Sequence, residues 1–148
     1  MVFAIIESVS DTSSVTTVAC CETCAELAKW YADEVEECFE MYASEESSSE
    51  EQEALKQCRE LWELAKAGAL TLKELSGIVT GSPTVSVELV GVYRDYREFC
   101  DGFESYKAQK PELKKITPEE NPADIEKECD RLNSLLIRSS IEDVVRPM

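Results

Sequence analysis

The sequence predicts an all-α protein, an antiparallel bundle of four longer helices plus one short helix. Two long segments repeat their apolar residues at alternating steps of three and four, which is the spacing of a helix seam. Clusters of glycine, proline and serine separate these segments from their neighbours. A chain of 148 residues has the length of one ordinary domain, so we expect a single helical domain over residues 1–148.

The first predicted helix lies between Asp11 and Ala43. Its apolar residues follow one another at steps of 3, 4, 3, 4, 3 and 4: Cys21, Cys24, Ala28, Tyr31, Val35, Cys38 and Tyr42. Charged residues fill most of the other positions, as on the solvent faces of an amphipathic helix. Residues 44–53 follow and are polar throughout, so they predict an acidic loop with nothing to hold it against a core.

The second predicted helix spans about Glu50 to Ala67. Ser49 and Gln52 have the spacing of a capping box, in which each side chain satisfies a free backbone N–H of the first turn. The apolar residues that we expect to face inward are Leu55, Cys58, Leu61, Trp62 and Ala65. A short helix should follow from Thr71 to about Val79.

The next segment begins at Ser82 and Pro83, a typical helix start because proline suits the first helical position. Its first apolar residues, Val85, Val87 and Leu89, alternate and would also suit a short strand. The longer pattern has steps of 4, 3, 4, 3, 4 and 3 and favours a helix. Its members are Val85, Leu89, Val92, Tyr96, Phe99, Phe103 and Tyr106.

The last part of the chain predicts an exposed linker and a final helix. Residues 109–122 are rich in lysine and proline and form the linker. Asn121 as cap, Pro122 as first residue and Asp124 in the first turn then open the helix. Its apolar face consists of Ile125, Cys129, Leu132 and Leu136.

The chain is strongly acidic, with 15 basic against 31 acidic residues and a formal net charge of −16. Such a charge repels nucleic-acid phosphates and anionic lipids, so direct nucleic-acid or membrane-surface binding is disfavoured. From Glu22 to Glu63 the chain carries fourteen acidic and three basic residues, a net of −11. The predicted interaction surface, for a protein partner with a basic surface, comprises Glu26, Asp33, Glu36, Glu37, Glu40, Glu45, Glu46, Glu50, Glu51 and Glu53.

The leading hypothesis is a non-enzymatic interaction module, an adaptor or inhibitor, which in a sharper version imitates a nucleic-acid backbone. The chain has no histidine, which excludes histidine-based triads, and no phosphate-binding P-loop. We therefore expect neither catalysis nor a cofactor. Ser47 and Ser48, each with a glutamate three positions later, fit acidic-directed phosphorylation sites.

Seven cysteines are spread along the chain without the dense spacing of secreted disulfide scaffolds, which indicates a reducing compartment, cytoplasmic or nuclear. Cys20, Cys21 and Cys24 include a Cys-x-x-Cys, the spacing of zinc ligands and redox dithiols. A metal- or redox-responsive protein is therefore the alternative function. Packing in a core is favoured for these thiols, because the chain lacks histidine and a second Cys-x-x-Cys.

The N-terminal segment is apolar but short. It runs into Glu7 without a basic leader, so it predicts no secretory signal, and no segment approaches the roughly 20 apolar residues of a membrane span. The apolar residues of this segment need burial, which self-association would supply: Val2, Phe3, Ile5 and Ile6.

Overall fold

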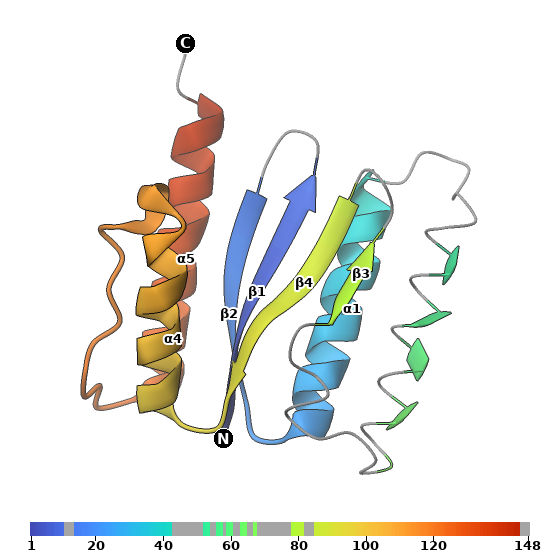
Figure 1. The fold of residues 1–148 in the computed structure, drawn as a ribbon, viewed down its shortest axis with the longest axis horizontal. Helices are drawn as coiled ribbons and strands as arrows, with labels where there is room; N and C mark the ends of the chain where they lie inside the picture. Colours follow the sequence, from blue (N-terminus) through green and yellow to red (C-terminus); the bar gives the residue numbers. More distant parts are fainter. Residues whose placement is uncertain are drawn as a thin grey trace.

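The computed structural model shows a mixed α/β protein, an antiparallel sheet with helices on both faces (Figure 1). It describes residues 1–10, 14–42, 52–53, 56–57, 59–60, 63–64, 67, 78–81 and 85–145. Helix α1 (Cys24–Tyr42) covers one face of the sheet, and helices α4 (Tyr96–Ala108) and α5 (Ile125–Val145) cover the other. The prediction of an all-α helical bundle is therefore wrong.

Three long strands and one short strand form the sheet, in the order β2-β1-β4-β3. Strand β1 (Val2–Ser10) pairs with β2 (Ser14–Cys21) on one side and with β4 (Val85–Tyr93) on the other. The short β3 (Val79–Gly81) pairs with β4 at the edge, and all neighbours are antiparallel. The N-terminal segment thus becomes a central strand of the sheet.

Side chains of β1 alternate between two cores. Ala4 and Ile6 point toward α1, whereas Phe3 and Ile5 point toward α4 and α5. A strand covered on both faces is a continuous apolar run without alternation, which explains why the sequence pattern did not reveal it. Since these residues are buried inside the protein's own core, they no longer give a reason to expect self-association.

Helix α1 confirms the helical pattern from Cys24 onward, but the predicted helix begins too early. Residues 14–21 form β2, and Thr23 caps the helix by accepting a hydrogen bond from the backbone N–H of Glu26 at 3.2 Å. Farther along α1, the Tyr31 hydroxyl donates to the carbonyl oxygen of Val87 in β4 at 2.7 Å. This bond ties the helix to the sheet.

The segment predicted as one helix from Val85 to Tyr106 is a strand followed by a helix. In β4 the register shifts so that Ile5 pairs with Gly91 and Ile6 with Leu89, which leaves Val90 as the extra residue of a β-bulge. Leu89 and Val92 then both pack toward α1, three residues apart. The bulge therefore places two side chains on one face of the strand three residues apart, which is the spacing of a helix.

Helix α4 begins after Asp95, whose side chain accepts from the N–H of Glu98 at 2.8 Å. Its apolar seam matches the predicted spacing, and Phe99, Phe103 and Tyr106 are buried. Gly91 and Gly102 let α4 and β4 approach the ring of Tyr93, since a Cβ at either position would lie within 2.3 Å of the Tyr93 hydroxyl oxygen. Small residues at these two positions thus make room for the aromatic core.

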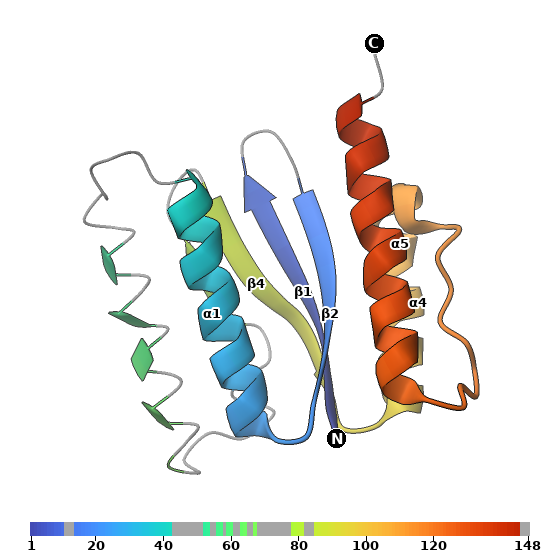
Figure 2. The same cartoon turned by 180° about the vertical axis from the view of Figure 1, so that it is seen from behind.

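Residues 109–122 are not the fully exposed linker that the sequence predicted. A short 3₁₀ helix, η1 (Pro111–Leu113), follows α4, and the side chains of Leu113 and Ile116 are buried in the core beneath α4 and α5. The final helix is confirmed, although α5 begins at Ile125. Figure 2 shows α5 alongside β2.

Two predicted helices fall largely outside the described residues. Within the second one, the described residues 52–53, 56–57, 59–60 and 63–64 are helical. The predicted short helix is contradicted at its end, because Val79 lies in β3, and residues 71–77 are outside the described part. Among the helices that the structure describes, none is both long and apolar enough to cross a bilayer.

Candidate functional site

A groove runs between helix α4 and the loop that leads into α5. Its volume is about 710 Å³, and α4 supplies one wall while residues 117–122 supply the other. The lining side chains belong to Tyr96, Arg97, Cys100, Asp101, Glu104, Thr117, Pro118, Glu120, Asn121, Pro122 and Ile125. It lies on the face of the sheet opposite α1.

Two side chains of α4 hold the loop in place. The Tyr96 hydroxyl donates a hydrogen bond to the carbonyl oxygen of Glu119 at 2.5 Å. The ammonium group of Lys107 donates to the Thr117 hydroxyl at 3.3 Å and also pairs with Glu104 at 2.9 Å. The wall opposite α4 is thus fixed by α4 itself.

The start of α5 holds the same loop from the other side. The Glu128 carboxylate, only 4% exposed, accepts from the backbone N–H of Glu119 at 3.1 Å. Arg131 donates to this carboxylate through Nε at 2.9 Å and to the carbonyl oxygen of Thr117 at 2.9 Å. The Arg131 hydrogen bond, followed by the Glu119 N–H, lowers the pKa of Glu128 although burial opposes the shift.

These contacts make the loop a preorganised wall. Backbone groups at Thr117 and Glu119 are bonded by side chains from two helices, so the irregular segment needs no partner to become ordered. A preformed concave surface loses less conformational freedom on binding than a mobile loop does. The geometry therefore favours a binding site.

Both apolar and charged side chains line the groove. Pro118 is buried and Tyr96 and Ile125 are half-buried, so part of the lining is apolar. The exposed carboxylates of Asp101, Glu104 and Glu120 outnumber the one guanidinium that lines it. Such a surface suits the side chain of a lysine or arginine, whose apolar stem ends in a cation.

Cys100 lies in the groove but is poorly suited to covalent chemistry. Burial raises the pKa of its thiol, the neighbouring Tyr96 hydroxyl only partly opposes this shift, and nearby carboxylates reinforce it. A cysteine with a raised pKa remains a protonated thiol at neutral pH and is a weak nucleophile. The groove thus presents no activated thiol.

The predicted acidic surface lies partly on α1. Asp33 and Glu37 are exposed, and the half-buried Glu34 between them has a raised pKa because of burial and then of repulsion by Glu37 and Asp33. Glu26 is exposed, but its carboxylate also accepts from the backbone N–H of Glu22 at 3.0 Å. Glu26 therefore helps to cap the helix.

The rest of the predicted acidic surface is largely outside the described part of the chain. Glu53 is described and exposed. The side chains of Glu36 and Glu40 are not among those described, and the same holds for the whole of Glu45, Glu46, Glu50 and Glu51 and for the predicted phosphorylation sites Ser47 and Ser48. Imitation of a nucleic-acid backbone and phosphorylation stay predictions.

The fold separates Cys20 from Cys21 and Cys24, which both belong to the core cluster on the α1 side. Cys20 faces the core under α4 and α5, whereas Cys21, the last residue of β2, faces α1. Cys24 is the first residue of α1, so this Cys-x-x-Cys connects a strand to a helix start. Burial raises the pKa of Cys21 to about 11, opposite to the shift of a reactive dithiol.

No metal-ligating cluster of three or more cysteine, aspartate or glutamate side chains occurs within the described residues. The predicted alternative that Cys20, Cys21 and Cys24 bind one metal ion together finds no support, because Cys20 lies on the opposite face of the sheet from Cys21 and Cys24.

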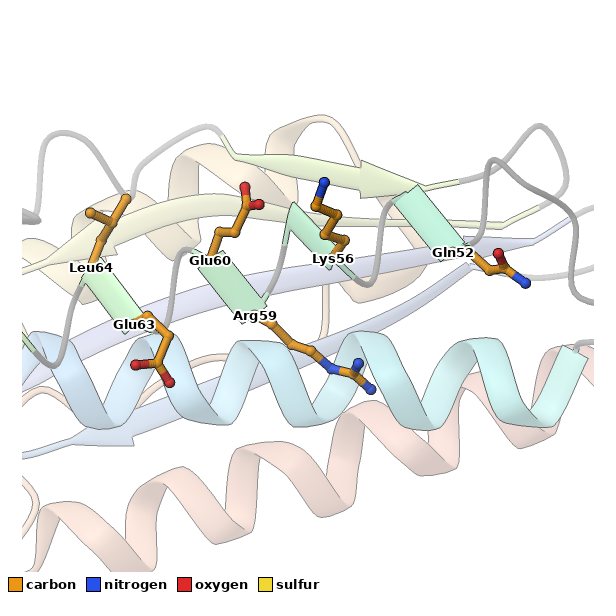
Figure 3. A pocket seen from close by; sticks show the side chains of 6 residues that line it. All are labelled: Gln52, Lys56, Arg59, Glu60, Glu63 and Leu64. Carbon is orange, nitrogen blue, oxygen red and sulfur yellow. The ribbon is translucent and has the colours of Figure 1, made fainter.

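A second hollow of about 620 Å³ lies along the helical residues of 52–64 (Figure 3). Lys56, Glu60 and Leu64 extend to one side of this segment, and Arg59 and Glu63 extend to the other. Among the described residues that line it, two cations and two carboxylates leave no net charge. This hollow gives no basis for selecting a ligand by charge.

Sequence reasoning missed the groove because it treated residues 109–122 as an exposed linker. The available signal was the apolar residues within it, Leu113, Ile116 and Pro118, which are buried. Buried residues on a connection show that it packs on the core and can shape a surface. The backbone contacts of Glu128 and Arg131 gave no signal, because a pattern of side chains does not show which backbone groups a side chain will bond.

No protein-family model, curated protein or solved structure matches the chain.

Proposed function

We propose that the protein is a non-catalytic binding module whose groove between α4 and residues 117–122 takes a basic segment of a protein partner. The observation that supports this most is the preorganised loop, which is held by Tyr96, Glu128 and Arg131. The lining carboxylates of Asp101 and Glu120 supply complementary charge for a lysine or arginine, whereas Glu104 already pairs with Lys107. The strongly negative protein attracts such a partner at long range.

A binding role accounts for the groove better than catalysis does. Cys100 is the one thiol that lines it, and its raised pKa disfavours nucleophilic attack. The tyrosine that lines it, Tyr96, has a raised pKa because of burial and the neighbouring thiol, so it acts as a hydrogen-bond donor rather than as a base. The groove therefore offers recognition groups without an activated reactant.

The acidic face of α1 is the competing surface for the same partner. Repulsion by Asp33 and Glu37 contributes to the raised pKa of Glu34, which indicates negative charges gathered on this helix. This face lies across the sheet from the groove, so one short segment cannot contact both (Figure 1). Two matched variants can therefore separate the surfaces.

The test measures fluorescence anisotropy with short labelled oligoarginine and oligolysine peptides. The groove variant is Asp101→Asn, Glu120→Gln, and the matched control on α1 is Asp33→Asn, Glu37→Gln. Both remove two negative charges from exposed positions. The groove variant should weaken binding roughly fivefold, because two exposed ion pairs contribute about 0.5 kcal/mol each.

The matched control should weaken binding by less than about twofold, because charges on the far side of the sheet act only through screened long-range attraction. Affinity of the unsubstituted protein should fall with added salt. Equal losses in both variants would show a non-specific electrostatic effect and contradict the groove. A larger loss in the α1 variant would move the binding surface to α1.

A further inference from the structure

Strand β2 and helix α5 are fastened to each other in a fixed register. The side-chain oxygen of Asn133 accepts from the backbone N–H of Val18 at 2.8 Å, and its amide nitrogen donates to the carbonyl oxygen of the same residue at 2.9 Å. Both backbone groups of Val18 therefore point away from β1, and the helix covers the edge of the sheet there.

One turn before Asn133, α5 carries Cys129, and two residues beyond Val18, β2 carries Cys20. Four residues of helix advance about 6 Å and two residues of strand about 6.8 Å, so the two steps match. Cys129 and the half-buried Cys20 belong to the same core cluster, and each thiol shifts the pKa of the other. The Asn133 bonds and the shared cluster thus place the two thiols next to each other.

From this juxtaposition we propose that Cys20 and Cys129 are a redox pair, which a low-molecular-mass disulfide such as oxidised glutathione converts into an intramolecular disulfide. The half-buried Cys20 is the accessible partner, whereas Cys129 is buried. The Cys20 thiolate attacks the small disulfide, forms a mixed disulfide and releases one glutathione thiolate. The Cys129 thiolate then attacks the Cys20 sulfur and releases the second, and the two thiol protons pass to the released glutathione thiolates.

The surroundings make this reaction slow at neutral pH. Burial raises the pKa of Cys20, and it raises that of Cys129 to about 12. Glu126 and Asp130 repel the Cys20 thiolate, the N-terminal amine favours it, and Asp130 and Glu128 repel the Cys129 thiolate. Since the thiolate is the attacking species, exchange should accelerate as the solution becomes alkaline.

The pairing differs from the one that Cys-x-x-Cys spacing suggests. Cys21 and Cys24 both belong to the core cluster on the α1 side of the sheet, whereas Cys20 and Cys129 belong to the cluster on the other side. A link from Cys20 to Cys129 would join an edge strand to the helix that holds the groove loop. The inference stands on β2 and α5 and does not require that the groove bind a basic segment.

The test exposes the reduced full-length protein to oxidised glutathione at alkaline pH and maps the products after alkylation and trypsin digestion. The expected product is intramolecular and joins the peptide of residues 1–29 to the peptide of residues 128–131, with fragmentation assigning the link to Cys20. Cys20→Ala and Cys129→Ala should each abolish it. Cys24→Ala and Cys100→Ala, which replace other half-buried thiols, should leave it intact.

Oxidation should also raise the melting temperature of the unsubstituted protein by roughly 5–15 °C, because the link closes a long loop. A product that joins Cys21 to Cys24, or full alkylation of Cys20 and Cys129 after the treatment, would overturn the proposal. The same holds for a linked form that melts no higher than the reduced one. Mapping on the unsubstituted chain keeps the test decisive if a variant fails to fold.

Discussion

The two faces of the sheet are covered in different ways. On the α1 side, mostly aliphatic side chains such as Leu27, Val35 and Leu89 form the core. On the other side, the rings of Phe3, Phe99 and Phe103 join with polar side chains that bond to strand and loop backbone. The first face is held mainly by burial of apolar surface, and the second adds directional bonds.

A polar cluster at the end of the second face shows this difference well. The Tyr106 hydroxyl donates to the Glu7 carboxylate at 2.5 Å and lies 2.8 Å from the Thr16 hydroxyl, while Lys110 pairs with Glu7 at 3.2 Å. Burial, followed by the Glu7 hydrogen bond, raises the pKa of Tyr106. Directional bonds fix positions more narrowly than apolar packing does, which suits the face that carries the groove.

The largest expected effect comes from the aromatic core. Phe99 contacts the rings of Phe3, Tyr93, Tyr96 and Phe103, and Phe99→Ala would remove the centre of this cluster. We expect a loss of about 4 kcal/mol in the free energy of unfolding, measured by urea denaturation. The matched change Leu27→Ala on the α1 face should cost about 3 kcal/mol. A loss below about 1 kcal/mol for Phe99→Ala would show that the rings are not a packed core.

The edge contact between α5 and β2 should have the next largest effect. Asn133→Ala removes two hydrogen bonds to Val18 and should lower the free energy of unfolding by about 2 kcal/mol. Asn133→Asp keeps the shape of the side chain but cannot donate to the Val18 carbonyl oxygen, so it should lower the free energy of unfolding at least as much as Asn133→Ala does. The exposed neighbour Ser134→Ala serves as the control and should change stability by less than about 0.5 kcal/mol. Unchanged amide exchange at Val18 in Asn133→Ala would contradict the contact.

The ion pair between Glu128 and Arg131 should stabilise the fold by an amount that depends on pH. Glu128→Gln should cost about 1–2 kcal/mol at neutral pH, a reduced value because Arg131 is 38% exposed and water screens the pair. The pKa of Glu128 is lowered from 4.5 in the folded protein, so its contribution is complete above pH 4.5 and is lost as pH falls through the lower folded value.

The difference in unfolding free energy between this variant and the unsubstituted protein should therefore shrink on acidification. Denaturation curves at a series of pH values measure it. A difference that stays constant from neutral to acidic pH would mean that the Glu128 charge does not stabilise the fold.

The smallest expected effect concerns the α1 face. Tyr31→Phe keeps the ring and removes the hydroxyl that donates to the Val87 carbonyl, so it should cost about 1 kcal/mol in thermal or urea unfolding. The effect should be smaller than that of Asn133→Ala, because the single hydroxyl hydrogen is donated mainly to Val87 and only at a long 3.4 Å to the carbonyl oxygen of Ile78. The reverse order would mean that the α1 face also depends mainly on directional bonds.

The helices were more predictable than the sheet for physical reasons. The seams of α1, α4 and α5 are visible because each helix buries one stripe and exposes the rest. Strand β1 is buried on both faces and shows no alternation, and the bulge at Val90 gives β4 a helical step. Local spacing therefore cannot distinguish these strands from helix segments.

The candidate site was less predictable than the fold. Its carboxylates Asp101, Glu104 and Glu120 are spread over twenty positions, and the predicted acidic surface was placed in the densest acidic region instead. The groove arises because Glu128 and Arg131 bond to backbone atoms near Thr117, a contact that no spacing rule encodes. Acidic density alone indicates attraction and does not indicate shape.

The central claim is that the face with directional bonds carries a preformed groove for a basic segment. The most direct test is the mapping of backbone amide chemical shifts while a short oligoarginine peptide is added to the isotope-labelled protein. We expect saturable shifts confined to residues 96–104 and 117–125. Shifts confined to residues 24–42 of α1, or small shifts spread over all exposed acidic residues, would contradict the claim.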